Sequence, residues 1–336
     1  MISDYLSKKL RFLSFFLVIL VVFIHNYFGN IPPTNTFSYI FQTTLSKGVC
    51  YVANPLFFII SGFLFFRKRE VPSIKNYSEM LTKRLRTLAI PYLLTSLLVI
   101  IIYGLLGITK FTSITDVLKV WLVEPIPFQL WFLRYLMLLS IISPIIYYLI
   151  KKTKYIYIVV ILLVWFFLYY KIDWALISLA FFSLGGFVSI NGIQIPYYNK
   201  NHFLLSISII GWVFLSYIAC IVYEDDLIVQ CLVRNIAIAC GLVAVWLLYD
   251  ILYKYINKWL DSDILSYSFF IYLFHLPLIL FVRKALLIVV PGSHSFVGNN
   301  IIYIITPMVT IFFCIILGKL MKRFIPPVYN IFTGSR

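Results

Sequence analysis

The chain has 336 residues, of which 62% are hydrophobic and only 12% are charged, and its formal net charge is +16. Soluble domains carry about 25% charged residues, so this composition and a mean hydropathy of +0.98 exclude an ordinary soluble protein. The hydrophobic runs are also too long for membrane barrel strands, which alternate over about ten residues. We therefore predict an all-α fold, a polytopic bundle of membrane helices.

The excess of Lys and Arg does not indicate a nucleic-acid partner, because these residues stand in short loops beside hydrophobic runs. Such a distribution orients membrane helices, and part of the charge is available for anionic lipid headgroups or an anionic cosubstrate. The five cysteines form no C-x-x-C pair and no spaced ligand motif with His or acidic residues. We therefore expect no metal site and no nucleic-acid binding.

The first hydrophobic run, residues 10–29, is long enough to cross a bilayer and contains one imidazole, His25, near its far end. An ionisable side chain inside such a run indicates a functional site. A run flanked by Lys8, Lys9 and Arg11 is also compatible with a signal peptide, but no small-x-small cleavage site follows it. We predict an uncleaved first helix whose basic end lies in the cytoplasm.

Cutting the sequence at charges, prolines and polar clusters gives ten predicted membrane spans. They are residues 10–29, 49–66, 88–107, 130–150, 155–170, 174–190, 203–222, 227–250, 264–283 and 299–321. Lys and Arg then concentrate on the side of the N-terminus, while Arg283 and Lys284 fall in an outer segment. This bias predicts both termini in the cytoplasm and one membrane-embedded domain over residues 1–336, in a bacterial cytoplasmic (inner) membrane. The outer residues 108–129 are amphipathic, and we expect an interfacial helix or a lid there.

Two arginines fall inside predicted spans or at their rims, Arg134 in LWFLRYLML and Arg234 in CLVRNIAIAC. Each is costly at mid-membrane unless it faces a partner, water or a bound anion. With a rise of about 1.5 Å per residue, His25 lies about 22 Å along its helix, the arginines lie near the outer ends of theirs, and His275 lies near mid-depth. We predict that these four residues converge on one cavity. The alternative is that the arginines snorkel and that His275 bonds a carbonyl freed by Pro277.

A basic cluster, Lys83-Arg84-Leu85-Arg86, precedes Pro91 where the third span begins. Such a cluster at the inner face of a membrane orients the helix that follows it. Guanidinium groups at the start of a helix also suit phosphate, which arginine binds through two parallel hydrogen bonds. The cluster therefore has two interpretations, a signal for topology or a phosphate site.

Five segments, taken in order, resemble the acyltransferase-3 family of integral membrane O-acyltransferases. They are VVFIHNYF, PLFFIISGFLFFRKR, KRLRTLAIPYLL, WFLRYLMLLSIISPII and SYSFFIYLFHLPL, and they cover most of the chain. The resemblance implies a ten-helix enzyme that takes an acyl group, usually acetyl, from cytoplasmic acyl-coenzyme A (acyl-CoA). The acceptor would be a hydroxyl on a cell-surface polysaccharide, a lipid-linked glycan or a small molecule. Relatives often carry an extra esterase-like domain, which we do not expect here.

The resemblance also implies which residues form the site. The catalytic histidine of the family corresponds to His25, and the arginines before the third-span proline correspond to Arg84 and Arg86. The late histidine motif places Tyr272 and His275 at or near the site.

The sequence departs from the family at one position near the first histidine. Many relatives have an arginine or lysine eleven positions before that histidine, where this chain has Ser14. Arg11 lies on roughly the same helical face, one turn nearer the cytoplasm. It is therefore a candidate to replace the missing cation in binding acyl-CoA.

Acyl transfer to a hydroxyl requires a base for the hydroxyl proton and a donor to the thioester oxygen. We expect the phosphates of coenzyme A to bind Arg84 and Arg86. His25 would then deprotonate the acceptor or carry the acyl group as a relay. Arg134 or Arg234 would stabilise the oxyanion or orient the acceptor.

Other interpretations of the sequence remain. The chain has no G-x-S-x-G elbow for a serine relay, and Ser61 is expected to pack helices together with Gly62. The main alternative function is a transporter or flippase for a glycan or lipid-linked sugar. In such a protein the arginines would bind an anionic substrate, and the many aromatic residues would line a sugar path. A receptor without catalytic activity is a third possibility.

Overall fold

The computed structural model describes residues 3–27, 36–67, 74–109, 111, 113–126, 128–168, 173–195, 201–223, 225–293 and 295–334. These residues contain helices and no strand, as predicted for a chain that must satisfy its backbone within a bilayer. The helices are α1 (Asp4–Asn26), α2 (Phe37–Thr43), α3 (Ala53–Phe66), α4 (Ile74–Leu105), α5 (Ile114–Leu122), α6 (Trp131–Thr153), α7 (Tyr155–Leu168), α8 (Asp173–Ile190), α9 (His202–Tyr217), α10 (Leu227–Ile256), α11 (Ser268–Val289), α12 (Phe296–Phe324) and α13 (Pro326–Thr333).

Within the described residues, seven helical stretches are long and apolar enough to cross a membrane. They are Phe37–Phe66, Tyr77–Leu105, Phe128–Thr153, His202–Val222, Leu227–Trp259, Asp263–Val289 and Phe296–Phe324. Two further apolar helices, Tyr155–Leu168 and Trp174–Ile190, are shorter, and α1 has charged residues in its first two turns. The polytopic helical architecture is therefore supported, while ten crossings and cytoplasmic termini stay predictions. The predicted span ends at 28–29 and 169–170 lie outside the described residues.

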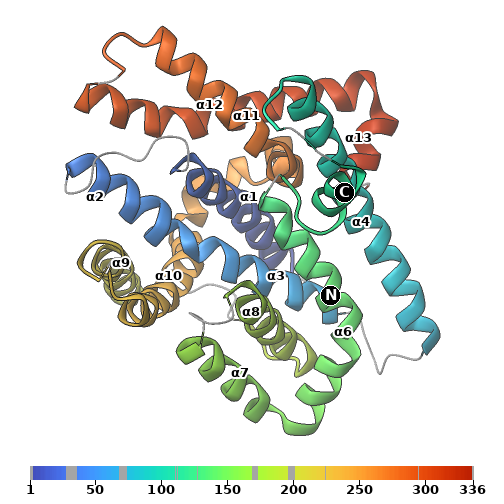
Figure 1. Cartoon of the computed structure of the whole chain (residues 1–336). Helices are drawn as coiled ribbons and strands as arrows, with labels where there is room; N and C mark the ends of the chain where they lie inside the picture. Colours follow the sequence, from blue (N-terminus) through green and yellow to red (C-terminus); the bar gives the residue numbers. More distant parts are fainter. Residues whose placement is uncertain are drawn as a thin grey trace.

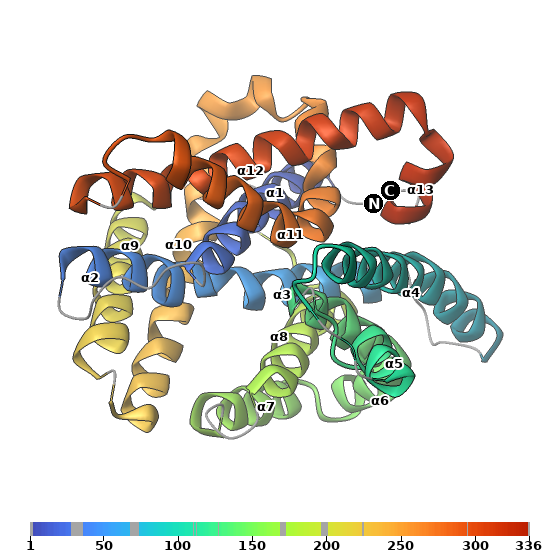
Figure 2. The ribbon, with the colours of Figure 1, turned by 45° about the horizontal axis from the view of Figure 1, so that its top comes forward.

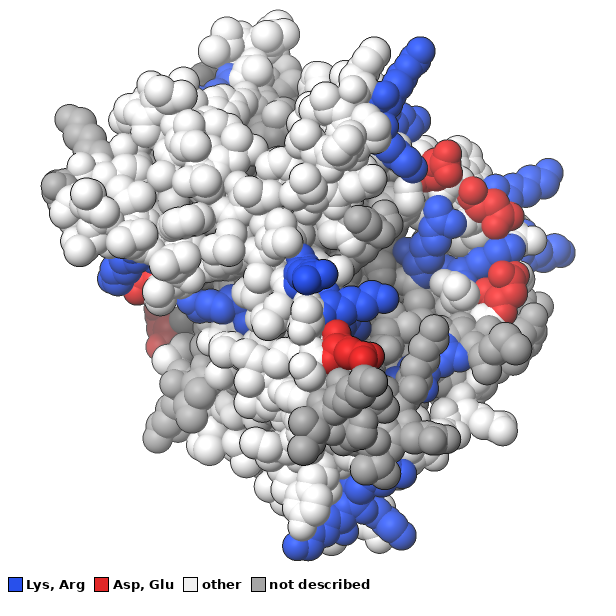
Figure 3. All heavy atoms as spheres, turned by 90° about the vertical axis from the view of Figure 1, so that its right-hand side faces the viewer, with Lys and Arg blue, Asp and Glu red and all other residues white. Residues whose placement is uncertain are grey.

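Helix α1 lies in the middle of the bundle, against α3, α11 and α12 (Figure 1). One hydrophobic core joins α1 to α3 and α10, a second joins α3 to α6, α7 and α8, and a third joins α1 to α4 and α11. Figure 2 shows α4, α5 and α6 on the side of the bundle opposite α9. The face in Figure 3 is largely uncharged, with Lys and Arg gathered in a few places, as expected of a surface that contacts lipid.

Helices α3 and α8 cross at two glycines. A Cβ added to Gly62 would lie 2.0 Å from the carbonyl oxygen of Phe182, and one added to Gly185 would lie 2.0 Å from that of Ile59. Small residues permit such close backbone approach between membrane helices. The packing prediction is therefore confirmed for Gly62. It is wrong for Ser61, whose side chain lines the cavity described below.

The first turns of α1 are joined to α10 by a buried ion pair. The Lys9 Nζ lies 2.6 Å from the Asp250 Oδ1, and the two side chains are 0% and 1% exposed. The Tyr5 hydroxyl donates to the same carboxylate oxygen, and the Lys9 ammonium lies 3.9 Å from the centre of the Trp246 ring. Lys9 was predicted to set the orientation of the first span. That orientation stays a prediction, and the structure adds that Lys9 is a buried link between α1 and α10.

The amphipathic segment before α6 contains a helix, α5, as expected. None of its residues is buried, but the Trp121 indole donates to the Leu93 carbonyl at 2.9 Å and so holds α5 against α4. A polar hydroxyl also caps its first turn, because Ser113 accepts a hydrogen bond from the Asp116 amide at 3.1 Å. Within the predicted segment 108–129, the residues Ile114–Leu122 therefore form a short helix fixed to the side of the bundle.

Candidate active site

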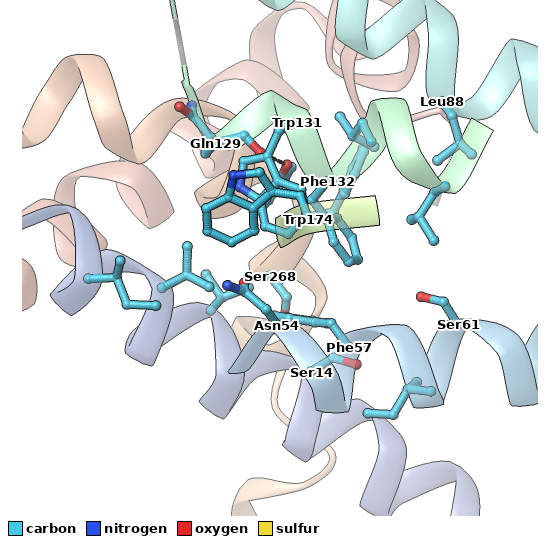
Figure 4. A pocket seen from close by; sticks show the side chains of 18 of the residues that line it. Ser14, Asn54, Phe57, Ser61, Leu88, Gln129, Trp131, Phe132, Trp174 and Ser268 are labelled. Carbon is cyan, nitrogen blue, oxygen red and sulfur yellow. Dashed lines mark hydrogen bonds between the residues drawn. The ribbon is translucent and has the colours of Figure 1, made fainter. Parts of the chain in front are cut away.

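A cavity of about 490 Å³ lies between α1, α3, α4, α6, α8 and α11 (Figure 4). Most of its lining is apolar or aromatic, with a few polar groups among them. The polar and charged lining residues are Ser14, His25, Tyr51, Asn54, Ser61, Arg84, Gln129, Ser268 and Tyr272. A concave, mostly apolar site of this volume with a small number of polar groups is typical of binding sites for small molecules.

One face of α1 forms a wall of the cavity. Ser14, Val18, Val21 and His25 all line it, and their spacing of three or four residues places them on the same face of a helix. Eleven residues of helix cover about 16 Å. The cavity therefore extends along α1 for roughly half the thickness of the hydrocarbon core.

His25 is 8% exposed, and its ring lies against that of His275, with 5.2 Å between the ring centroids. His275 is fully buried and does not line the cavity. Its Nδ1 lies 2.9 Å from the Tyr272 carbonyl and 3.0 Å from the Ile271 carbonyl. Because a carbonyl only accepts, Nδ1 carries the proton in the neutral ring, and Nε2 is an acceptor without a hydrogen-bond partner among the described residues. His275 therefore contacts carbonyls of its own helix, as the alternative allowed, but not the one freed by Pro277, because the Leu273 carbonyl accepts from the Gln129 side chain.

The basic cluster on α4 is divided between the cavity and the surface. Arg84 lines the cavity and is half-buried, and its guanidinium lies 5.3 Å from the centre of the Phe65 ring. Arg86 is exposed and is not part of the lining. The structure therefore brings Arg84 into the same cavity as His25 and leaves Arg86 outside it.

Ser14 and Arg11 have different positions relative to the cavity. Ser14 lines it, and its hydroxyl donates to the Leu10 carbonyl at 2.8 Å. Arg11 is not part of the lining, and its Nη2 donates to the Ser262 carbonyl at 3.0 Å. At this end the cavity wall therefore carries a small hydroxyl, and Arg11 joins α1 to the segment before α11.

Tyr272 of α11 lines the cavity and is bonded to its opposite wall. The Tyr272 hydroxyl donates to the main-chain carbonyl of Gln129, and the Gln129 side chain donates to the Leu273 carbonyl at 3.1 Å. The Tyr272 ring also packs edge-to-face on Phe132, with 5.9 Å between the centroids. Because these bonds are reciprocal, the short turn Phe128–Leu130 that precedes α6 is held against α11 at the site.

Neither of the predicted span arginines lines the cavity. Arg134 donates to the main-chain carbonyl of Val123, just after α5. Arg234 donates to Gln230 at 2.8 Å and lies 5.5 Å from the centre of the Tyr51 ring. Of the four residues predicted to converge on one cavity, only His25 is in its wall. His275 and Arg234 each contact a lining residue from behind, and Arg134 faces the outer segment.

The sequence reasoning missed an aromatic wall. The rings of Trp131 and Trp174 lie 4.3 Å apart between centroids, and Phe128 meets Trp174 edge-to-face at 6.3 Å. Figure 4 shows the two indoles across the cavity from Asn54 and Phe57 of α3. The only sequence feature that could have indicated this part of the cavity is Asn54, a polar residue inside an apolar run. Nothing in the sequence pairs two tryptophans that lie on different helices.

The fold and the cavity define a membrane-embedded helical protein that encloses an imidazole and a guanidinium in one site. The family model Acyl_transf_3, described as an acyltransferase domain, matches residues 9–319. The chain therefore belongs to the acyltransferase-3 family, which confirms the resemblance carried by the five segments, and it is a membrane acyltransferase. No curated protein and no solved structure matched the chain in the other two comparisons.

Proposed function

We propose that this acyltransferase moves an acyl group, acetyl in the simplest case, from cytoplasmic acyl-CoA to a hydroxyl of a cell-surface or lipid-linked glycan. The observation that carries the proposal is the presence of His25 and Arg84 in one elongated cavity. An imidazole is suited to accept the hydroxyl proton, and a guanidinium is suited to bind phosphate. The two groups match the two halves of the reaction.

In the proposed reaction His25 takes the proton of the acceptor hydroxyl, and the oxygen attacks the thioester carbonyl carbon. The tetrahedral oxyanion then collapses, the carbon–sulfur bond breaks, and the leaving thiolate receives the proton from the imidazolium. In the relay version the His25 nitrogen attacks first, the carbon–sulfur bond breaks and the thiolate leaves. The acceptor oxygen then displaces the imidazole from the acyl group, and the acceptor proton passes to the thiolate. Both routes give an ester and free coenzyme A, and both require His25 at the cavity wall.

The oxyanion needs a hydrogen-bond donor in the cavity. Because Arg134 and Arg234 are absent from the lining, we propose Asn54 in their place. Its side chain lines the cavity on the wall formed by α3. A neutral amide of this kind donates to a developing negative charge without the cost of placing a cation in the bundle.

The acceptor proposal is supported by the wall formed by Trp131, Trp174 and Phe128. Sugar rings have apolar C–H faces and polar edges, so they match indole faces on one side of a site and amide or hydroxyl groups on the other. Tyr51 and Asn54 supply such polar groups in this cavity. We therefore place the acceptor between the tryptophans and α3.

For acyl-CoA, we propose that Arg84 binds a phosphate group directly. The exposed Arg86, two residues further along α4 and on its surface, would add a weaker and salt-sensitive contact. Arg11 donates a hydrogen bond to the Ser262 carbonyl. In this arrangement it fixes the N-terminal half of α1 and does not bind acyl-CoA.

The proposal is tested with purified protein and labelled acetyl-CoA. Acceptor-dependent release of coenzyme A should occur with the wild-type protein and be lost in His25→Ala. His202→Ala is the matched control, because His202 is an exposed histidine at the start of α9 and is not part of the cavity. A His25→Ala protein with full activity would refute the assignment. A transporter would instead move a glycan with no acyl donor present.

The acceptor is tested in cells. Mass analysis of surface glycans should show an ester in cells with the wild-type protein and none in cells with His25→Ala. Trp174→Ala should reduce the ester strongly, and Trp174→Phe less so, because phenylalanine keeps part of the aromatic face. Unchanged glycans in every strain would contradict the glycan acceptor.

A further inference from the structure

A buried cation holds the main chain next to His25. Arg283 of α11 is only 4% exposed, and its Nη1 donates to the main-chain carbonyl of Asn26 at 2.7 Å. The sequence analysis placed Arg283 in an outer segment, because a predicted span ended at this charge. The predicted end of the span at Arg283 is wrong, since α11 continues to Val289 and Arg283 is a buried residue within it.

The contact lies at the C-terminal end of α1, where carbonyls lack partners inside the helix. Two of them are satisfied by other helical segments. The Ser46 hydroxyl donates to the Phe23 carbonyl at 2.7 Å, and Arg283 donates to the Asn26 carbonyl. The Asn26 side chain in turn donates to the Tyr303 carbonyl at 2.7 Å. The last turn of α1, which carries His25, is therefore fixed from three directions.

A neutral donor would be enough to satisfy one carbonyl, so the use of a guanidinium needs a reason. The Nε and Nη2 atoms of Arg283 are buried and have no hydrogen-bond partner among the described residues. A buried cation with unused donors is costly in a protein interior. Part of this cost is offset because a positive charge is favourable at the C-terminus of a helix. Among the described residues, the Asn26 carbonyl is the only hydrogen-bond partner of the Arg283 side chain.

Helix α11 contacts α1 on both sides of the imidazole. His275 packs against the His25 ring, and Arg283, eight residues later and about 12 Å along the same helix, bonds the carbonyl of Asn26, the residue that follows His25. We propose that Arg283 is the positioning residue for His25 and keeps the imidazole at the cavity wall. The inference rests on the proposed function, in which His25 performs the proton transfer.

The test compares three variants of the full chain. Arg283→Met removes the donors but keeps a long side chain, and Arg283→Lys keeps a charge and one point of donation. Lys284→Met is the matched control, because it removes the same charge from the neighbouring, exposed residue. For each purified protein we would measure kcat, KM for acetyl-CoA, and the rate at which diethyl pyrocarbonate modifies His25 relative to the exposed His202, by mass spectrometry.

Arg283→Met should lower kcat by about a hundredfold, the size of effect expected when a reacting group is misplaced by about 1 Å. The KM for acetyl-CoA should stay unchanged, the His25 to His202 labelling ratio should rise several-fold, and Arg283→Lys should restore part of kcat. Lys284→Met should match the wild-type protein in all three measurements.

A folded Arg283→Met protein with wild-type kcat and labelling ratio would overturn the inference, and so would a change confined to KM. If Arg283→Met does not fold, Arg283→Lys decides, and a Lys variant identical to the wild type in kcat and labelling would overturn the need for the guanidinium. If the wild-type protein transfers no acyl group, the proposed function fails. The labelling ratio then still tests whether Arg283 positions the His25 ring.

Discussion

The imidazole rings of His25 and His275 lie 5.2 Å apart between centroids and are tilted by 47°, yet only His25 lines the cavity. His275 is fixed by two backbone carbonyls and is fully buried. The two histidines of the family resemblance therefore have different positions in one site, and we expect substitutions at them to have different effects.

The first prediction concerns these two residues. His25→Ala should lower acyl transfer by about a thousandfold or more, since general acid–base catalysis contributes on the order of 10²–10⁴. His275→Phe should lower it less, because the ring that packs on His25 is kept and only its nitrogens are lost. The measurement is the rate of coenzyme A release by both variants. Equal losses would mean that His275 also reacts directly.

The second prediction separates the two arginines of α4. Arg84→Ala should weaken coenzyme A binding by about 1.5–3 kcal/mol, the range for hydrogen bonds to charged groups. Arg86→Ala should weaken it much less, because Arg86 is exposed and solvent screens its charge. Titration calorimetry in detergent, at low and at moderate salt, measures both. Similar losses in the two variants would place the phosphates at the surface of α4 rather than in the cavity.

The third prediction concerns the Lys9–Asp250 pair. Asp250→Ala leaves the Lys9 ammonium buried without its carboxylate, and removing one partner of a buried pair costs about 3–5 kcal/mol. The double variant Lys9→Met with Asp250→Leu should recover most of this loss, since an apolar pair of similar volume is often neutral or stabilising. Thermal unfolding followed by tryptophan fluorescence tests both. A double variant as unstable as Asp250→Ala would contradict the account.

The fourth prediction uses the glycines between α3 and α8. Gly62→Ala and Gly185→Ala should each destabilise the protein by at least about 1–3 kcal/mol, the usual cost of overpacking, because the new methyl group meets main-chain oxygen. Gly104→Ala is the control, since a Cβ there has no neighbour within 4 Å and alanine is the better helix former. Melting temperatures of the three variants measure the difference. A Gly62→Ala protein as stable as the control would show that the helices separate easily.

Composition and run length predict the helices well, because only backbone-satisfied segments persist in a bilayer. The functional position of His25 could also be predicted, since an ionisable group in an apolar run is costly and therefore indicates a functional site. Charges at the ends of runs were interpreted less well. Lys9 and Arg283 were taken as loop or topology charges, but a carboxylate and a carbonyl from distant helices bury them. Such partners lie hundreds of residues away in the chain and leave no local pattern.

Helix phase explains the remaining differences in the site. Arg84 and Arg86 are two residues apart and so point to different sides of α4. The sequence contains that difference, but it does not say which side faces His25. The pairing of Trp131 with Trp174 depends on how α6 meets α8, which is a property of the packed bundle. Local patterns therefore find the reacting imidazole and miss the surfaces around it.

The glycine contact also bears on how large molecules reach the reaction centre. Helix α3 carries Asn54 and Phe57, and α8 begins beside Trp174, so two sides of the chamber belong to helices whose main chains touch at Gly62 and Gly185. Sliding or parting these helices would break backbone contact along the crossing. Any helix movement during entry and exit of donor and product is therefore expected at other walls of the cavity, such as α4, which supplies Arg84 and Leu88 to the lining.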